Sequence, residues 1–138
     1  MIFSYKKFRA KGQFISEHLR PMIPVVIRNG TKSATIEGIL DTGADHILVN
    51  KQWAKALNID LKTAPRSTTT GIIGPPVPIL WSKAEIEILG HPDTKSVIDL
   101  AFIDSPNVGL LLGQHGFFDL FRITFDRTNN CIEIIKSP

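Results

Sequence analysis

"GILDTGADHILV", residues 38–49, places one aspartate between an apolar run and a Thr-Gly pair. The alternating residues 34–40 predict a strand, and its last two residues, Ile39 and Leu40, indicate an end that is buried on both faces. Such a strand would carry Asp41 into the interior, where a carboxylate is costly unless it is paired or used. Asp41 is therefore the candidate catalytic residue, and we expect it to need a second carboxylate as its partner.

The residues after Asp41 suit a carboxylate that is held in a defined position. Gly43 lacks a Cβ, so backbone N–H groups can approach the carboxylate. The Thr42 hydroxyl is expected to turn inward and hydrogen-bond to neighbouring backbone, which would lock the loop. Ala44 is small enough for backbone or substrate to pass close by. The same triplet also fits an Asx turn after a strand, so the surrounding sequence has to decide between the two.

Short strands and turns account for most of the remaining chain. Asn29 and Gly30 predict a hairpin turn, because both residue types tolerate positive φ. Residues 50–59 predict a short helix, with Asn50 as its cap. Residues 66–81 predict a hairpin with a mobile apolar tip, and the prolines after the tip favour an edge strand because they lack backbone donors.

The order of these elements predicts the class of fold. About eight short strands, one or two short helices and no βαβ rhythm indicate an all-β domain, a small and mostly antiparallel barrel or sandwich. The sequence contains one short internal similarity, which we call the sequence echo: residues 38–43 and 109–113 both run from a glycine through buried aliphatic residues to another glycine.

Composition and charge predict the domain organisation. A length of 138 residues and an apolar content of 43% indicate one folded domain with a core. The net charge is +3, but the first 16 residues hold four of the 16 basic residues and no acid, which leaves 12 basic and 13 acidic residues in the rest. We therefore predict a basic and flexible N-terminal arm over residues 1–19, followed by the domain over 20–138.

Several classes of site are disfavoured by the residues that the chain carries. The single cysteine, Cys131, excludes internal disulfides, and the four histidines form no metal-ligand pair, so we expect neither a metal nor a cofactor. No GxSxG or Walker motif is present. No apolar run approaches the ~18 residues of a membrane span, and residues 1–12 lack the apolar core of a signal peptide. The cytoplasm is therefore the default location, although a piece of a larger precursor would have the same features.

Three segments in order carry a resemblance to a known family. "GILDTGADHILV" resembles the active-site segment of aspartic proteases, and specifically of the single-domain, retroviral-type (retropepsin-like) branch. "TTTGIIGPP", residues 68–76, lies where that family has its glycine-rich flap. "GLLLGQHGFFDLF", residues 109–121, is similar to the apolar strand and short helix that pack behind the acidic loop. The resemblance covers residues 20–135.

The resemblance implies a fold, an assembly and a reaction. The fold would be a small closed barrel of the retroviral protease type with one or two short helices, in a two-fold homodimer. Members hydrolyse peptide bonds with two facing carboxylates that share one proton: the ionised one activates a water and the protonated one polarises the scissile carbonyl. This chain has no second Asp-Thr-Gly or Asp-Ser-Gly, so the second carboxylate would be Asp41 of another copy. Asp41, Thr42 and Gly43 would form the catalytic segment of this acid protease.

Substrate-binding roles also follow from the resemblance. A peptide or unfolded protein would bind as an extended strand between the acidic loop and the flap, with apolar pockets beside it. The expected binding residues are Ala44, Asp45, Gly71, Ile72, Ile73, Gly74, Val77 and Leu112. Two positions depart from the family pattern: His46 stands where many members have a second acid, and Gln114 stands where an arginine ties to the loop's acid. The ion pair of the loop is thus expected to be weakened or replaced.

Two other functions fit parts of the sequence. A catalytically silent relative would be a dimeric β-barrel that binds extended peptide segments and keeps Asp41 for packing. An unrelated small barrel would bind nucleic acid through the basic residues 6–11, which lie near Phe3, Tyr5 and Phe8. The remaining residues carry no such excess of basic charge, so no nucleic-acid partner is expected.

Overall fold

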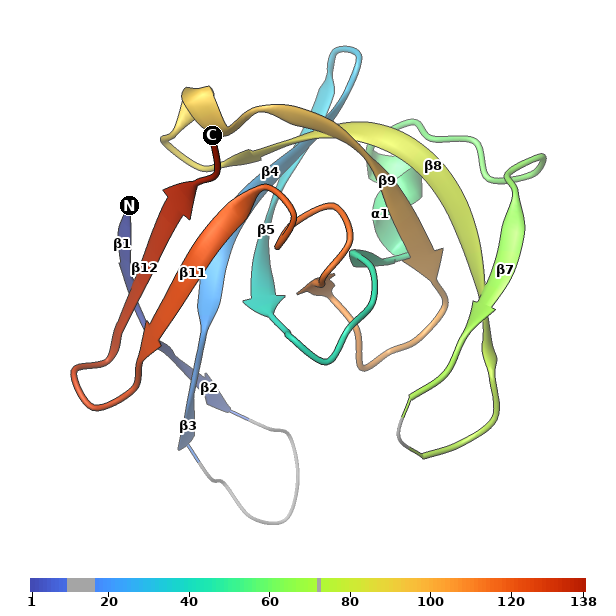
Figure 1. Cartoon of the computed structure of the whole chain (residues 1–138). Helices are drawn as coiled ribbons and strands as arrows, with labels where there is room; N and C mark the ends of the chain where they lie inside the picture. Colours follow the sequence, from blue (N-terminus) through green and yellow to red (C-terminus); the bar gives the residue numbers. More distant parts are fainter. Residues whose placement is uncertain (10–16, 72) are drawn as a thin grey trace.

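Six strands close into a barrel in the order β4-β5-β10-β6-β9-β8, and β8 returns to pair with β4 (Figure 1). The computed structural model describes residues 1–9, 17–71 and 73–138. It confirms the all-β prediction, with one short α-helix, α1 (Gln52–Ala56), and one 3-10 turn, η1 (Pro92–Thr94). The barrel strands are β4 (Met22–Asn29), β5 (Lys32–Leu40), β6 (Leu48–Asn50), β8 (Val77–Ile88), β9 (Ser96–Ile103) and β10 (Leu110–Leu112).

The two segments of the sequence echo lie side by side in the barrel. The end of β5 and strand β10 pair in parallel, with Ile39 opposite Leu111 and Leu40 opposite Leu112. The Asp41 N–H continues this pairing by donating to the Leu112 carbonyl at 3.0 Å. The pairing therefore fixes the point at which the chain leaves β5 and the Asp-Thr-Gly loop begins.

Alternation along β6, β8, β9 and β10 separates two apolar clusters on opposite faces of the strands, because successive side chains of a strand point to opposite sides. The main core contains, for example, Val49, Phe102 and Leu112. The second cluster is smaller, and only some of its members are fully buried. Its residues are Leu48, Val77, Ile79, Trp81, Ala101, Ile103, Val108 and Leu111.

A hairpin of β7 (Arg66–Thr69) and β8 extends from the barrel (Figure 1). The prediction that the strand after the prolines is an edge is wrong, because β8 pairs with β9 on one side and with β7 and β4 on the other. Pro78 is tolerated there because it precedes Ile79, where the pairing with β9 begins. The edge of the sheet is β7, which pairs only with β8 among the described strands.

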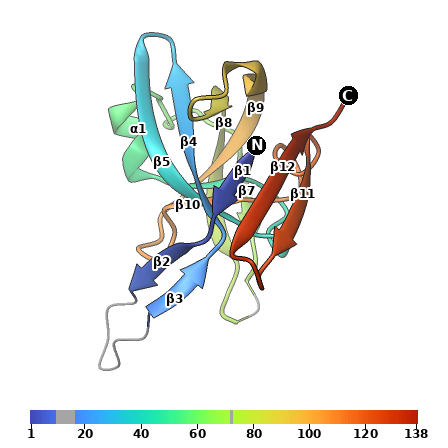
Figure 2. The same ribbon diagram turned by 90° about the vertical axis from the view of Figure 1, so that its left-hand side faces the viewer.

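Strands from both ends of the chain form two further sheets (Figure 2). The three-stranded sheet has the order β1-β12-β11, and the two-stranded sheet joins β2 to β3. The segment 1–19, predicted as a basic arm, thus contains β1 and β2, and the Lys6 ammonium pairs with the Glu37 carboxylate at 2.6 Å. Among the described residues, no helix has the length and apolar character to cross a bilayer. The bounds are β1 (Ile2–Ser4), β2 (Lys6–Arg9), β3 (Glu17–Arg20), β11 (Phe121–Asp126) and β12 (Cys131–Lys136).

Candidate active site

The Asp41 carboxylate lies at the end of β5, in a loop that hydrogen-bonds back onto it. The Gly43 N–H donates to Asp41 Oδ1 at 2.9 Å, and the Ala44 N–H donates to the Asp41 carbonyl at 3.2 Å. These bonds form an Asx turn. The two interpretations of the sequence, an Asx turn and a carboxylate held in a defined position, therefore describe the same structure. Asp41 is half-buried, which leaves part of its side chain accessible.

Residues 112–115 support this loop from behind. The Gln114 N–H donates to the Ala44 carbonyl at 2.9 Å, and the His115 N–H donates to the Asp45 carbonyl at 2.8 Å. At Gly113 the two segments touch, because a Cβ there would lie 2.5 Å from the Ala44 carbonyl oxygen and closer still to that of His46. Only glycine fits a contact of this kind, so Gly113 sets how closely the support approaches the loop.

The two departures from the family pattern have visible consequences. The Gln114 side chain donates from Nε2 to the Thr42 carbonyl at 2.9 Å, so a neutral hydrogen bond braces the loop. No ion pair joins Asp45 to any residue within the described parts of the chain. Thr42 is exposed, contrary to the expectation that its hydroxyl turns inward.

Sequence reasoning missed an aromatic cluster around His46. The His46 ring meets the Trp81 ring edge-on, with centroids 4.9 Å apart, and stacks on the His115 ring at 5.5 Å. More than thirty positions separate His46, Trp81 and His115 in the sequence. The parallel bridge joins His46 to His115, and Trp81 is brought close by its pairing with Ala101, whose N–H donates to the Ile47 carbonyl. The cluster links the acidic loop to strand β8 at the base of the hairpin.

Of the predicted flap residues, Gly71, Ile73 and Gly74 lie at the tip of the β7–β8 hairpin, at the same end of the barrel as the Asp41 loop (Figure 1). Ile73 is 93% exposed there. Gly74 has a φ of +103°, which favours glycine over other residues. Gly71 is also exposed, whereas Ile72 lies outside the described residues.

Of the apolar residues expected to bind substrate, Val77 is half-buried and Leu112 is buried. Leu112 is 0% exposed and belongs to the main core. Its neighbour Leu111 points to the opposite face, is half-buried, and packs in the second cluster with Val77 and Val108. A strand of three leucines gives no period from which to tell the two faces apart, so the sequence carried no signal for Leu111.

Other carboxylates also accept backbone N–H groups in local turns, among them Asp60 from Lys62 at 2.9 Å and Asp126 from Asn129 at 3.0 Å. The pKa of Asp126 lies below its usual value, because the Asn129 side chain and backbone N–H both donate to its carboxylate in the β11–β12 turn. No three His, Cys, Asp or Glu side chains gather at a metal site in the portion of the chain that the structure describes.

Comparisons with known proteins agree with this architecture. A family model described as aspartyl protease matches residues 23–115, about two-thirds of the chain. The crystal structure of a retropepsin-like aspartic protease from Rickettsia conorii has a TM-score of 0.64 at 18% identity, covering 98% of this chain and 97% of that chain. The retroviral protease-like domain of Ddi1 from Leishmania major has a TM-score of 0.57 at 16% identity, covering 86% of this chain and 92% of that chain. A comparison with curated protein sequences gives no match. The chain therefore belongs to the aspartyl protease family and has the retropepsin-like fold.

Proposed function

We propose that this protein is an aspartic endopeptidase whose catalytic centre forms when two copies associate around a two-fold axis. The observation that carries the proposal is the half-buried Asp41 carboxylate, held by the Gly43 N–H at the end of a barrel strand. The chain supplies a single Asp-Thr-Gly segment, so a two-fold axis through the site would bring Asp41 of one copy to its twin.

In the dimer, the two Asp41 carboxylates would share one proton. Like charges about 3 Å apart resist simultaneous ionisation, so one carboxyl stays protonated while the other is ionised. The ionised member takes a proton from a bound water, which attacks the scissile carbonyl. The protonated member polarises that carbonyl, and a proton then passes to the leaving amine. No covalent intermediate with the enzyme is formed.

The substrate would be an extended peptide that lies between the Asp41 loop and the flap. Ala44 and Asp45 would hold its backbone on the loop side, and residues 71–74 would close over it from the hairpin. Closure would exclude bulk water and strengthen the electrostatic interactions at the dyad. The half-buried members of the second apolar cluster, Val77 and Leu111 among them, would receive its apolar side chains.

Cleavage of unfolded casein tests the proposal. We expect the wild-type protein to cut casein at about pH 4 to 6, where a shared proton can persist on the dyad, and a statine-type inhibitor to block the reaction. Sedimentation should show a dimer, and the specific activity should fall on dilution as the dimer dissociates. A monomer that cleaves casein would refute the mechanism, whereas a dimer that binds peptide without cutting it would support the silent peptide-binding alternative.

Leu111 and Leu112 provide a paired test of the substrate pocket. Leu111→Ala is expected to raise KM several-fold with little change in stability, because its side chain faces the proposed cleft. Leu112→Ala is expected to lower the free energy of unfolding by about 2–5 kcal/mol, because it leaves a cavity in the core. Urea unfolding and peptide kinetics separate the two effects. Equal destabilisation by both variants would place Leu111 in the core and contradict the pocket.

A further inference from the structure

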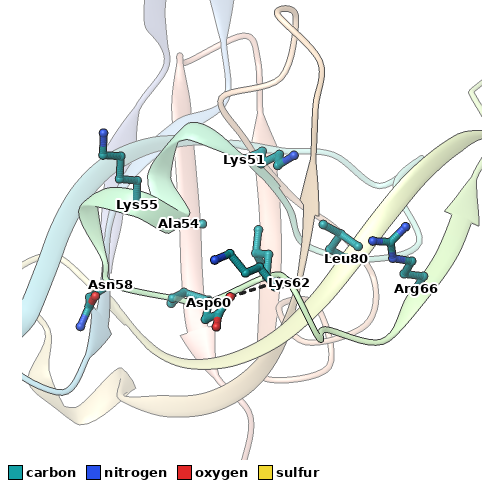
Figure 3. A pocket seen from close by; sticks show the side chains of 10 residues that line it. Lys51, Ala54, Lys55, Asn58, Asp60, Lys62, Arg66 and Leu80 are labelled. Carbon is teal, nitrogen blue, oxygen red and sulfur yellow. Dashed lines mark hydrogen bonds between the residues drawn. The ribbon is translucent and has the colours of Figure 1, made fainter.

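A basic hollow lies between helix α1 and the start of strand β7 (Figure 3). Its volume is about 540 Å³, and its side chains come from α1 and the following turn on one side and from β7 and β8 on the other. Four cations line it together with the single acid Asp60. The cations are Lys51, Lys55, Lys62 and Arg66, and the apolar walls are Ala54, Ile59, Leu61 and Leu80.

The positive charge of this hollow is not neutralised by ion pairs among the described residues. Across residues 1–9, 17–71 and 73–138, no carboxylate forms an ion pair with any of the four cations. Asp60 accepts the backbone N–H of Lys62 at 2.9 Å, which engages part of its carboxylate in a local turn. Four cations and one acid leave three net positive charges around one hollow. By contrast, Lys83 and Lys6 each have an acid partner, Asp99 at 2.9 Å and Glu37 at 2.6 Å.

The hollow continues toward the hairpin that carries the predicted flap. A second hollow shares Lys51, Arg66 and Leu80 with the first and extends to Val77 and Pro78. Asp104 also lines it, so the two hollows together hold four cations and two acids, a net charge of +2. Val77 also belongs to the second apolar cluster, whose member Leu111 pairs with Ile39 near the end of β5. Both hollows together form a basic groove along the hairpin. Arg66 begins β7, whose outer edge pairs with no other described strand.

We propose that the basic groove binds an acidic segment of a polypeptide substrate, outside the residues that surround the scissile bond. This inference rests on the proposed endopeptidase function. The edge of β7 offers backbone groups to an extended chain. The four cations are spread over the walls, so they suit several carboxylates along a peptide better than one phosphate group. The apolar walls would receive aliphatic side chains between the acids.

Peptide binding to Asp41→Asn protein tests the groove without cleavage. We expect a fluorescent peptide that alternates Asp and Leu to bind, and its counterpart with Asn and Leu to bind much more weakly. Lys62→Gln/Arg66→Gln should weaken binding of the acidic peptide by about tenfold, because two charge contacts are lost. The control Lys32→Gln/Lys83→Gln removes the same charge at exposed sites elsewhere and should change binding by less than about twofold. Fluorescence anisotropy at low and high salt measures the binding of both peptides to the parent Asp41→Asn protein and to the two double variants.

Three outcomes distinguish a specific groove for acidic peptides from general electrostatic attraction. Equal weakening by the two double variants would mean non-specific attraction and would overturn the proposal. Inorganic polyphosphate or single-stranded RNA that binds the groove while the acidic peptide does not would also overturn it. If the groove binds the acidic peptide but the wild-type protein cuts no substrate, the groove proposal is supported and only the proposed proteolysis is rejected.

Discussion

Asp41→Asn is expected to abolish peptide cleavage while the protein keeps its fold and its dimer. The amide Oδ1 can still accept the Gly43 N–H, which donates to Asp41 at 2.9 Å, so the loop keeps its turn. An amide at this position can neither take a proton from water nor share one with its twin. General acid–base catalysis contributes typically 10²–10⁴-fold, so we expect the rate to fall by about 10³-fold or more. The melting temperature should change by less than about 3 °C.

Mixing wild-type and Asp41→Asn protein tests whether both copies supply a carboxylate. If subunits exchange freely, an equal mixture contains about a quarter of wild-type homodimers, and only these would be active. The mixture should therefore have about a quarter of the activity of pure wild-type protein at the same total protein concentration. Independent subunits would instead give roughly one half. Activity near one half after full exchange, which mass spectrometry of differently labelled chains can verify, would contradict the shared dyad.

Gly113→Ala is expected to displace the Asp41 loop and to destabilise the protein strongly. The new Cβ would lie 2.5 Å from the Ala44 carbonyl oxygen, and backbone rather than a flexible side chain would have to move. The movement would break the Gln114–Ala44 and His115–Asp45 backbone hydrogen bonds. Overpacking and these lost bonds should cost about 3 kcal/mol or more. A displacement of about 1 Å at the dyad can by itself reduce the rate about 10²-fold.

Gly109→Ala is the matched control for this substitution. An added Cβ at Gly109 meets no atom within 4 Å, and Gly109 has no positive φ, so its free energy of unfolding should change by less than about 1 kcal/mol. Thermal unfolding of the two variants gives the comparison, with Gly113→Ala expected to melt about 10 °C lower. If Gly113→Ala unfolds like Gly109→Ala, the loop does not depend on the close contact with residues 112–115.

The sequence was sufficient for the parts of the fold that depend on local pattern. The alternating residues of β5 and the turn at Gly30, which has a φ of +58°, were both predicted from the sequence and are present in the structure. The similarity between residues 38–43 and 109–113 was visible in the sequence, but the pairing of these segments became clear only from the structure. Two segments with the same small-apolar-small pattern pair closely with each other, and that pairing positions Asp41.

Features that depend on which face a residue presents were beyond the sequence. Strand β10 consists of three leucines, and no polar residue among them shows which face is exposed. The sequence therefore could not tell whether Leu111 or Leu112 points into the core. The central position of β8 came from pairings with three strands, which outweigh the local preference of proline for edges. The basic groove was hidden because its four cations are spread over residues 51–66 and converge only through the turn after α1.

The pairing of β5 with β10 would also govern when a newly made chain gains the proposed activity. The Thr42 carbonyl is held by a side chain 72 positions later, and the Asp41 N–H is held by Leu112. Contacts between such distant positions form late, because a long loop must close first. During synthesis on the ribosome, Asp41 emerges well before the residues that support it. The chain would remain inert toward its neighbours until residues 112–115 have left the exit tunnel and docked.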